Sequence, residues 1–249
     1  MRLVLLDLDG TMYDRGAPVP GAAAAVQTLR RRGIQVRFFT NTDSQSAESL
    51  LARARSRGVP AGPGDLFTPV TAAQRHLDGV PGARVLLLGN AAVRGELAEH
   101  CTLTDEAPTH VIIGDCHEEL TYERLDAAFR AVRGGAELVA LQRGRYSRNA
   151  DGDHLDTGAL VAAVEYAAEV EAGLLGKPSV DFLRLAAGDA TDVWVAGDDR
   201  STDIAMALAG GACAVQVRTG KYADQRSRTD LALASYEMNS VADLPAWLS

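Results

Sequence analysis

Residues 4–11 read VLLDLDGT, an apolar run that contains two acids and is ended by a glycine. The apolar residues predict a buried strand over residues 2–8, and Gly10 marks its end. Carboxylates at the end of a buried strand are costly unless a partner compensates their charge. Asp7 and Asp9 are therefore the first candidates for a functional site.

Strand and helix patterns alternate along the rest of the chain. The first strand is followed by an expected helix over 18–33, a strand over 34–41 and a helix over 47–57, which ends at a glycine. Further strands are expected at 83–90, 109–115, 136–142, 173–178, 191–199 and 212–217, and further helices at 91–99, 121–133, 157–169, 179–187 and 201–209. This alternation predicts an α/β fold with a doubly wound, Rossmann-like parallel sheet. Because no linker is rich in Pro, Gly or Ser, any second domain must be an insertion. Residues 235–248 predict a closing helix, with Trp247 packed on the core.

Composition narrows the class of protein. The chain has 249 residues and a net charge of -8, which argues against nucleic acid or an anionic membrane as a general partner. Its three cysteines, Cys101, Cys116 and Cys213, are too scattered for a disulfide framework, which favours a cytoplasmic protein with reduced thiols. No apolar stretch is long enough for a membrane helix. Only Lys177 and Lys221 of the 25 basic residues are lysines, so each invites a chemical explanation.

Four of the expected strands end in side chains that can do chemistry, at the edge where open parallel sheets bind ligands. These residues are Asp7 and Asp9; Thr40 and Asn41; Lys177; and Asp198 and Asp199 with Asp203 one turn later. Clustered carboxylates repel one another, and a hard cation such as Mg²⁺ removes that repulsion. The lysine, the Thr40 and Asn41 donors, and the backbone amides after Asp9 would then hold phosphate oxygens. The set predicts a phosphoryl-transfer site.

Each of these features also has a structural explanation on its own. Asp9 with Gly10 can be a turn, Asp198 and Asp199 can cap a helix, and Lys177 can be a solvated side chain. Those explanations do not account for the four groups following one another at strand ends in this order, which favours the functional interpretation.

DLDGT (7–11), TN (40–41), GKP (176–178) and GDDRSTD (197–203) resemble the four motifs of the haloacid dehalogenase-like hydrolase superfamily. The long gap between the second and third motifs resembles subfamily IIA, in which an α/β cap is inserted at that point. FTNTDSQSAESLLARARSRG, GRYSRNADG and VRTGKY look most like the group containing phospholysine phosphohistidine inorganic pyrophosphate phosphatase. Some members of that group have serine where this chain has Asp9, and the acid here argues for a working catalyst.

The resemblance implies a role for each matching residue. Asp7 would be the nucleophile that forms an aspartyl-phosphate, and Asp9 would be the general acid and then the general base. Thr40 and Lys177 would hold the transferred phosphoryl group, and Asn41 would orient the substrate. The expected Mg²⁺ ligands are Asp7, the Asp9 backbone carbonyl and Asp198, with Asp203, or less favoured Asp199, supporting metal-bound water.

The same resemblance implies a core of residues 1–79 and 173–249 and an inserted cap of residues 80–172. The cap would exclude water from the site and select the leaving group. A homodimer formed through the cap is also expected from the family. Residues 141–158 are the expected substrate-contact stretch, where Arg143, Arg145 and Arg148 can meet an anion or form a solvated charge run. His117 and His154 have no expected catalytic role, because this mechanism needs no histidine.

The sequence thus predicts a Mg²⁺-dependent phosphatase acting on a small phosphorylated metabolite: a phosphomonoester, pyrophosphate or a phosphoramidate. The alternative is a non-catalytic phosphometabolite-binding protein on the same scaffold, against which the intact acid set counts. A receiver-type signalling domain would be about half this length and would not carry its acids in this pattern. Phosphonate- or halide-cleaving relatives usually depart from the Asp-x-Asp pattern or place the cap elsewhere.

Overall fold

The computed structural model describes residues 1–149 and 151–248, which form two compact units. The first unit comprises residues 1–40, 48–67 and the chain from 177 onward, and the second comprises 41–47 and 68–176. The boundaries expected at 79/80 and 172/173 both fall inside the second unit. The longer segment of that unit begins at Thr68, because the helix that follows packs on the next helix of the same unit.

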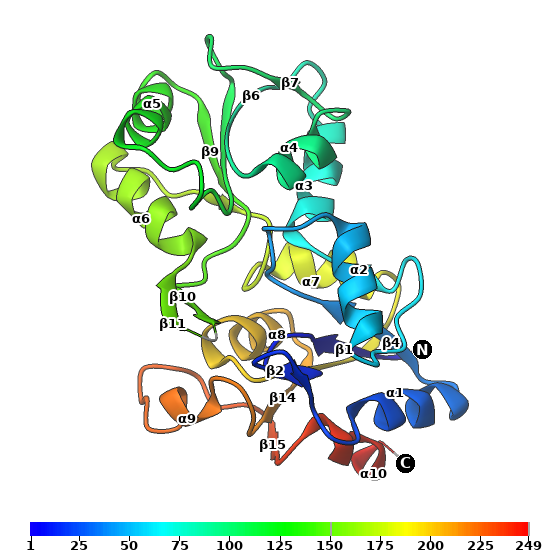
Figure 1. Ribbon diagram of the computed structural model, residues 1–249. Helices are drawn as coiled ribbons and strands as arrows, with labels where there is room; N and C mark the ends of the chain where they lie inside the picture. The colour runs from blue at the N-terminus through cyan, green and yellow to red at the C-terminus, as the bar shows by residue number, and fades with distance from the viewer. Residues whose placement is uncertain (150, 249) are drawn as a thin grey trace. The chain divides into compact units, whose positions relative to one another are not determined.

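A six-stranded parallel sheet forms the centre of the first unit (Figure 1). In spatial order its strands are β15 (Tyr236–Met238), β14 (Cys213–Val217), β13 (Asp192–Gly197), β1 (Arg2–Asp7), β4 (Gln35–Phe39) and β5 (Leu66–Phe67). The opening strand β1 is central: Leu6 pairs with Ala196 on one side and with Phe38 on the other. A central parallel strand is covered on both faces, which explains its unbroken apolar run.

Helices cover both faces of this sheet. Val4, Leu6 and Phe38 pack with Val26 and Leu29 of α1 in one cluster. The elements on that face are α1 (Ala22–Arg31), α2 (Ala47–Ser56), the turn η2 (Val241–Asp243) and α10 (Leu244–Trp247). The remaining helices contact the sheet elsewhere: α7 (Val180–Ala187) contacts β1, whereas the π-helical turn η1 (Arg200–Ile204) and α8 (Ala205–Ala209) contact β14. This arrangement confirms the doubly wound, Rossmann-like fold predicted from the sequence.

A short hairpin that was not predicted follows the opening motif. It consists of β2 (Tyr13–Asp14) and β3 (Ala17–Pro18), and the Gly10 N–H donates to the Tyr13 carbonyl at 2.7 Å. Gly10 has a φ of +88°, a backbone conformation that favours glycine. The glycine therefore lets the chain turn sharply after Asp9 and return beside it.

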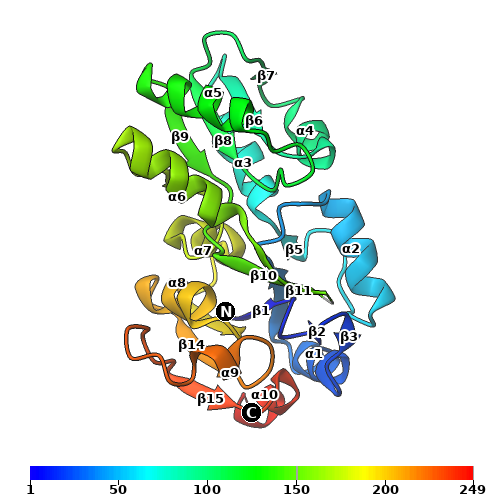
Figure 2. The ribbon, with the colours of Figure 1, turned by 60° about the vertical axis from the view of Figure 1, so that its left-hand side comes forward.

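The second unit has its own parallel sheet, with α5 and α6 packed in one apolar cluster and α3 and α4 in another (Figure 2). The strands of this sheet, in spatial order, are β12 (Gly173–Leu174), β9 (Glu137–Ala140), β8 (His110–Ile113), β6 (Arg84–Leu88) and β7 (Thr102–Leu103). The helices of the unit are α3 (Pro69–Asp78), α4 (Ala91–Leu97), α5 (Tyr122–Arg133) and α6 (Thr157–Ala168). A separate hairpin is formed by β10 (Tyr146–Asn149) and β11 (Gly152–Leu155). Alternate residues of β6 enter the two clusters, Leu86 and Leu88 facing α5 and α6, and Val85 and Leu87 facing α3 and α4.

Two expectations about the chain after residue 172 were wrong. The strand expected at 173–178 is only Gly173–Leu174, and it pairs with β9 in the second unit, so Lys177 does not end a strand of the core sheet. The tail is not a single helix, because residues 236–238 complete the edge of the core sheet beside β14 before α10 begins. Trp247 is 50 % exposed and packs on the ring of Tyr236, which in turn stacks on Trp194.

The remaining element of the chain is the short helix α9 (Tyr222–Gln225). All three cysteines are free thiols, as expected from their scattered positions. Among the described residues, no helix is both long and apolar enough to cross a membrane.

Candidate active site

The carboxylate of Asp7 and the ammonium of Lys177 form the centre of the site in the first unit. Lys177 Nζ lies 2.6 Å from Asp7 Oδ1 and 2.7 Å from Asp203 Oδ1, and all three side chains are buried. Lys177 also lies 4.5 Å from the centre of the Phe39 ring. Because β1 and β4 run in parallel, their carboxyl ends bring Asp7 beside Phe39, and Lys177 reaches both from the loop before α7.

Asp198 completes an acidic group beside this pair. Carboxylate oxygens of Asp7, Asp198 and Asp203 all lie within 4.8 Å of one another. The Lys221 N–H donates to Asp198 Oδ2 at 2.6 Å. A Cβ added at Gly10 would lie 2.4 Å from this oxygen, and one added at Gly220 would lie 2.0 Å from it. Two glycines therefore hold open the space that the Asp198 carboxylate occupies.

The two acids that follow Asp198 point in different directions. Asp203 accepts from Lys177 with Oδ1 and from the Asp199 N–H with Oδ2, so it orients both the lysine and the strand end. Asp199 instead accepts from Ser201 at 2.5 Å and pairs with Lys221 Nζ at 3.0 Å. Burial acts to raise the pKa of Asp199, but the charge of Lys221 and hydrogen bonds from Gln225, Ser201 and Lys221 lower it to about 2. Of these two acids, the structure groups Asp203 rather than Asp199 with Asp7 and Asp198.

The charges of this group do not balance. Burial raises the pKa values of Asp7, Asp198 and Asp203 above the usual range; Lys177 opposes the shift for Asp7 and Asp203, and repulsion from Asp7 adds to it for Asp198. Burial favours neutral Lys177, but Asp203 and Asp7 raise its pKa above the ordinary value. One ammonium, which contacts two of the three carboxyl groups, cannot offset the charge of all three when they are ionised. These residues fit a hard divalent cation such as Mg²⁺.

The other expected site residues take different positions. The Asp9 side chain is 55 % exposed, and its carboxylate is not in the group formed by Asp7, Asp198 and Asp203. Thr40 is buried directly after β4, and its N–H donates to the Phe67 carbonyl at 3.1 Å. Asn41 belongs to the second unit. The structure thus brings Asp7, Lys177, Asp198 and Asp203 together and leaves Asp9 at the solvent side of the first unit.

The arginines expected to contact substrate differ in their surroundings. Arg143 forms an ion pair with Glu165 of α6, and Arg145 is exposed. The side chain of Arg148 lies outside the described residues. His117 is exposed beside Asp115, and His154 is exposed beside Asp151, so neither histidine belongs to the acidic group.

Sequence reasoning missed a buried acid in the second unit. Asp43 is 3 % exposed and accepts from the Thr157 hydroxyl at 2.7 Å. Burial raises its pKa to about 8, and repulsion from Asp156 and Asp115 adds to this shift although the Thr157 bond opposes it. The neighbouring Ser44 carbonyl accepts from Asn90, and the Ala47 N–H donates to Glu96. Segment 41–47 is thereby fastened to α4 and α6 of its unit.

Replacing Asp43 with asparagine is expected to raise the free energy of unfolding at pH 7 by up to about 4 kcal/mol. In the unfolded chain the pKa of Asp43 is the ordinary value of 3.8, whereas burial raises it to about 8 in the folded chain. Between these values the folded state keeps a proton that the unfolded state has lost. The free energy of unfolding therefore falls as the pH rises from about 4 to about 8. Above pH 8 this group causes no further decrease. Asp43→Asn removes this slope and keeps an acceptor for Thr157.

Urea unfolding across this pH range measures the effect. Asp105→Asn, at an exposed position of the same unit, is the control and is expected to change stability by less than about 0.5 kcal/mol. An unchanged pH slope in Asp43→Asn would show that Asp43 is ionised in the folded protein.

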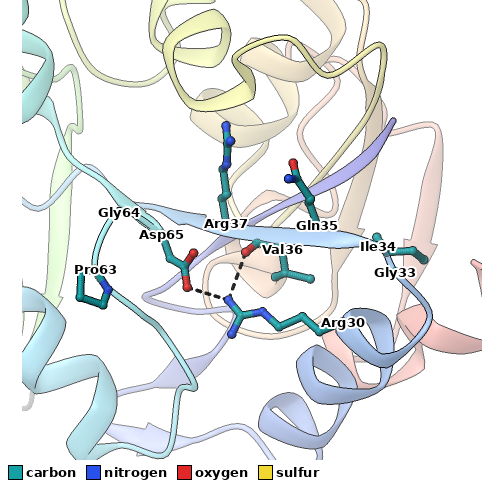
Figure 3. A pocket seen from close by; sticks show the side chains of 9 residues that line it. All are labelled: Arg30, Gly33, Ile34, Gln35, Val36, Arg37, Pro63, Gly64 and Asp65. Atoms are coloured by element: carbon teal, nitrogen blue, oxygen red, sulfur yellow. Dashed lines mark hydrogen bonds and ion pairs between the residues drawn. The ribbon is translucent and has the colours of Figure 1, made fainter.

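A cavity of about 450 Å³ lies at the opposite end of β4 from Thr40 (Figure 3). Strand β5 pairs with only Phe38 and Phe39, which leaves the first half of β4 at the edge of the sheet. Arg30 fills part of this edge by donating to the Val36 carbonyl at 3.2 Å and to Asp65 at 2.8 Å. The cavity is therefore a feature of the sheet edge, and its charged lining protects an open strand.

Comparisons with known proteins agree with this fold. Residues 4–101 match the family model described as haloacid dehalogenase-like hydrolase, and residues 174–244 match a second, HAD-hydrolase-like model. Mouse haloacid dehalogenase-like hydrolase domain-containing protein 2 is 34% identical over 226 residues, covering 89% of this chain and 86% of the relative. Phospholysine phosphohistidine inorganic pyrophosphate phosphatase of Danio rerio is 33% identical, covering 88% and 83%. The solved p-nitrophenyl phosphatase from Archaeoglobus fulgidus has a TM-score of 0.90 at 26% identity, covering 99% and 98%.

The chain belongs to the haloacid dehalogenase-like hydrolases, with the inserted α/β cap of the structures it matches. It is an enzyme, a phosphatase of that family, as the motifs in its sequence predicted.

Proposed function

We propose that this phosphatase hydrolyses a small phosphorylated metabolite with the help of Mg²⁺ and through a covalent aspartyl-phosphate on Asp7. The observation that carries the proposal is the group of three buried carboxylates within 4.8 Å of one another, two of which contact the ammonium of Lys177. Such a group favours a hard cation and a substrate with several anionic oxygens. The names of the relatives, which include phosphatases for nitrophenyl phosphate and for pyrophosphate, support the choice of substrate class.

The proposed metal ligands are Asp7, Asp198 and the Asp9 backbone carbonyl. Asp203 is proposed to support metal-bound water and is not itself a ligand. When bound, Mg²⁺ supplies positive charge that offsets the carboxylates and polarises phosphoryl oxygens. Lys177 holds Asp7 by Oδ1 at 2.6 Å, whereas Oδ2 has a longer, 3.4 Å contact with the Thr11 hydroxyl. Oδ2 is accordingly the oxygen proposed to attack phosphorus, and a carboxylate needs no base for this step.

Asp9 protonates the departing oxygen and then accepts a proton from the hydrolytic water. Its exposed side chain suits this role, because leaving group and water both arrive from solvent. Lys177 and Thr40 bind the transferred phosphoryl group, and Asn41 orients the substrate. Both atoms and charge balance: the ester oxygen leaves with the proton of Asp9, and water restores Asp7 and releases phosphate.

The second unit is proposed to act as the cap that excludes bulk water and selects the leaving group. A homodimer formed through this cap remains a prediction, as does the cytoplasmic location, for which the three free thiols are the support.

The proposal is tested with 4-nitrophenyl phosphate, which we expect to be hydrolysed in the presence of Mg²⁺ and not after chelation with EDTA. A second readout avoids turnover altogether: Mg²⁺ is expected to raise the Tm of the parent protein by binding the folded state. Asp198→Asn should lose this shift, whereas Asp199→Asn should keep it, because Asp199 faces Lys221 instead.

Hydrolysis that continues unchanged in EDTA would contradict the metal-assisted mechanism. A folded protein that binds Mg²⁺ yet hydrolyses neither 4-nitrophenyl phosphate nor pyrophosphate would favour the non-catalytic binding protein.

A further inference from the structure

Arg53 and Tyr13 lie beside Asp9 and have no role in the mechanism above. Arg53 lies on α2, and its Nη2 is 3.7 Å from Asp9 Oδ2, too far for a hydrogen bond. Tyr13 follows Asp9 in the hairpin, and its side chain is completely buried. These three residues belong to the first unit, as do Asp7 and Lys177. A cation and a buried hydroxyl group are therefore close to Asp9 within the first unit.

The guanidinium of Arg53 has two buried donors that are unused. Arg53 Nε and Nη2 are shielded from solvent, and within residues 1–149 and 151–248 neither has a hydrogen-bond acceptor. The hydroxyl of Tyr13 is likewise buried and has no hydrogen-bond partner among the described residues. Unsatisfied buried donors are costly and uncommon, so they need a functional explanation.

The two free donors of Arg53 lie on the same edge of the guanidinium. Nε–H and Nη2–H point in parallel, and this spacing matches the two oxygens of a carboxylate or a phosphate. A neutral hydroxyl or a single carbonyl can use only one of them. The edge is therefore suited to a second anionic group of the substrate, distinct from the phosphoryl group that Lys177 holds.

We propose that Arg53 is a specificity-determining residue that binds an anionic group on the leaving-group side of the substrate. This inference rests on the proposed function, because it is the role of Asp9 as general acid that puts the leaving group next to Arg53. The preferred substrates are then phosphate esters or anhydrides whose leaving group carries a carboxylate or a further phosphate close to the scissile oxygen. The buried hydroxyl of Tyr13, which has no hydrogen-bond partner among the described residues, is a further donor close to Asp9.

Two probes of matched size test this role: phosphoglycolate, with a carboxylate, and 2-hydroxyethyl phosphate, with a hydroxyl at the same place. In Arg53→Gln, kcat/KM for phosphoglycolate is expected to fall ~10- to 100-fold more than kcat/KM for 2-hydroxyethyl phosphate. Arg53→Lys should recover only part of this preference, because an ammonium lacks the parallel donors. Arg57→Gln is the control: Arg57 lies over the Tyr13 ring, 4.4 Å from its centre, and its removal should leave the preference between the probes in place.

An equal loss for both probes in Arg53→Gln would overturn the proposal and would make Arg53 a residue that only orients Asp9. Calorimetry in an Asp7→Asn background gives an answer that does not depend on turnover. With Mg²⁺ present, phosphoglycolate should bind more tightly than 2-hydroxyethyl phosphate, and Arg53→Gln should remove the difference. If binding shows this pattern but the parent protein hydrolyses neither probe, the proposed function fails and the role of Arg53 stands.

Discussion

Replacing Asp7 with asparagine is expected to reduce kcat for 4-nitrophenyl phosphate by about 10⁴-fold or more, the usual cost of removing a nucleophile. Asparagine has the shape of aspartate, but its amide oxygen is a poor nucleophile. The parent protein should form an acid-stable, hydroxylamine-labile phosphoryl adduct when quenched during turnover, and the variant should form none. This adduct distinguishes attack by Asp7 from direct attack by water.

The variant is expected to fold normally. Lys177 keeps its 2.7 Å contact with Asp203, and the removal of one carboxylate relieves repulsion with Asp198. Its Tm should therefore equal or exceed that of the parent protein. A folded Asp7→Asn protein with more than about one hundredth of the parent activity would show that another group attacks phosphorus.

Replacing Lys177 with methionine is expected to lower the free energy of unfolding by about 3 to 5 kcal/mol, because the change leaves buried charges without their partner. The Lys177 side chain is only 4% exposed, and it is the ammonium within 2.7 Å of both Asp7 and Asp203. Urea unfolding without metal measures the loss, and saturating Mg²⁺ should restore part of it by replacing the missing positive charge. Activity should also fall, since the transferred phosphoryl group loses its cationic donor.

The only other lysine provides the matched control. Lys221 Nζ pairs with Asp199 at 3.0 Å, but its side chain is 22% exposed, and water can partly replace its contact. Lys221→Met is expected to cost about 1 kcal/mol, and Mg²⁺ should not restore that loss specifically. Equal costs for the two substitutions would mean that Lys177 does not balance a buried acidic group.

Much of the fold could be predicted because its signals are local. The buried strand of residues 2–8 and the helix–strand alternation after it follow from apolar periodicity and from glycines at element ends, and β1, α1 and β4 form where expected. Most of the acids and the lysine of the site could be listed for the same reason, since they lie at or just after the end of an apolar run, and Asp203 follows one turn later. Their convergence required the topology, which parallel pairing of β1 with β4 and β13 provides.

The features that were missed depend on contacts distant in sequence. Nothing near Tyr236 indicates that an edge of the sheet is open beside β14, so the short strand β15 was predicted as helix. Leu174 has a strand-like environment, but its partner Ala140 belongs to the other sheet. Gly220 resembles an ordinary turn residue until the Asp198 carboxylate is found against it. Arg53 shares α2 with Arg55, and only its distance from Asp9 and its unsatisfied buried donors distinguish it.

The path of the chain around residue 40 has a consequence for exchanging specificity between relatives. A cap moved between homologues as one block of residues 68–176 would leave Asp43 behind and separate it from the Thr157 hydroxyl. It would also separate Ser44 and Ala47 from Asn90 and Glu96. The transferable module therefore has two pieces, and the seven-residue piece, 41–47, begins directly after the threonine that follows β4. Chimaeras that carry both pieces should keep a native-like second unit, because the short upstream loop brings its own contacts with α4 and α6.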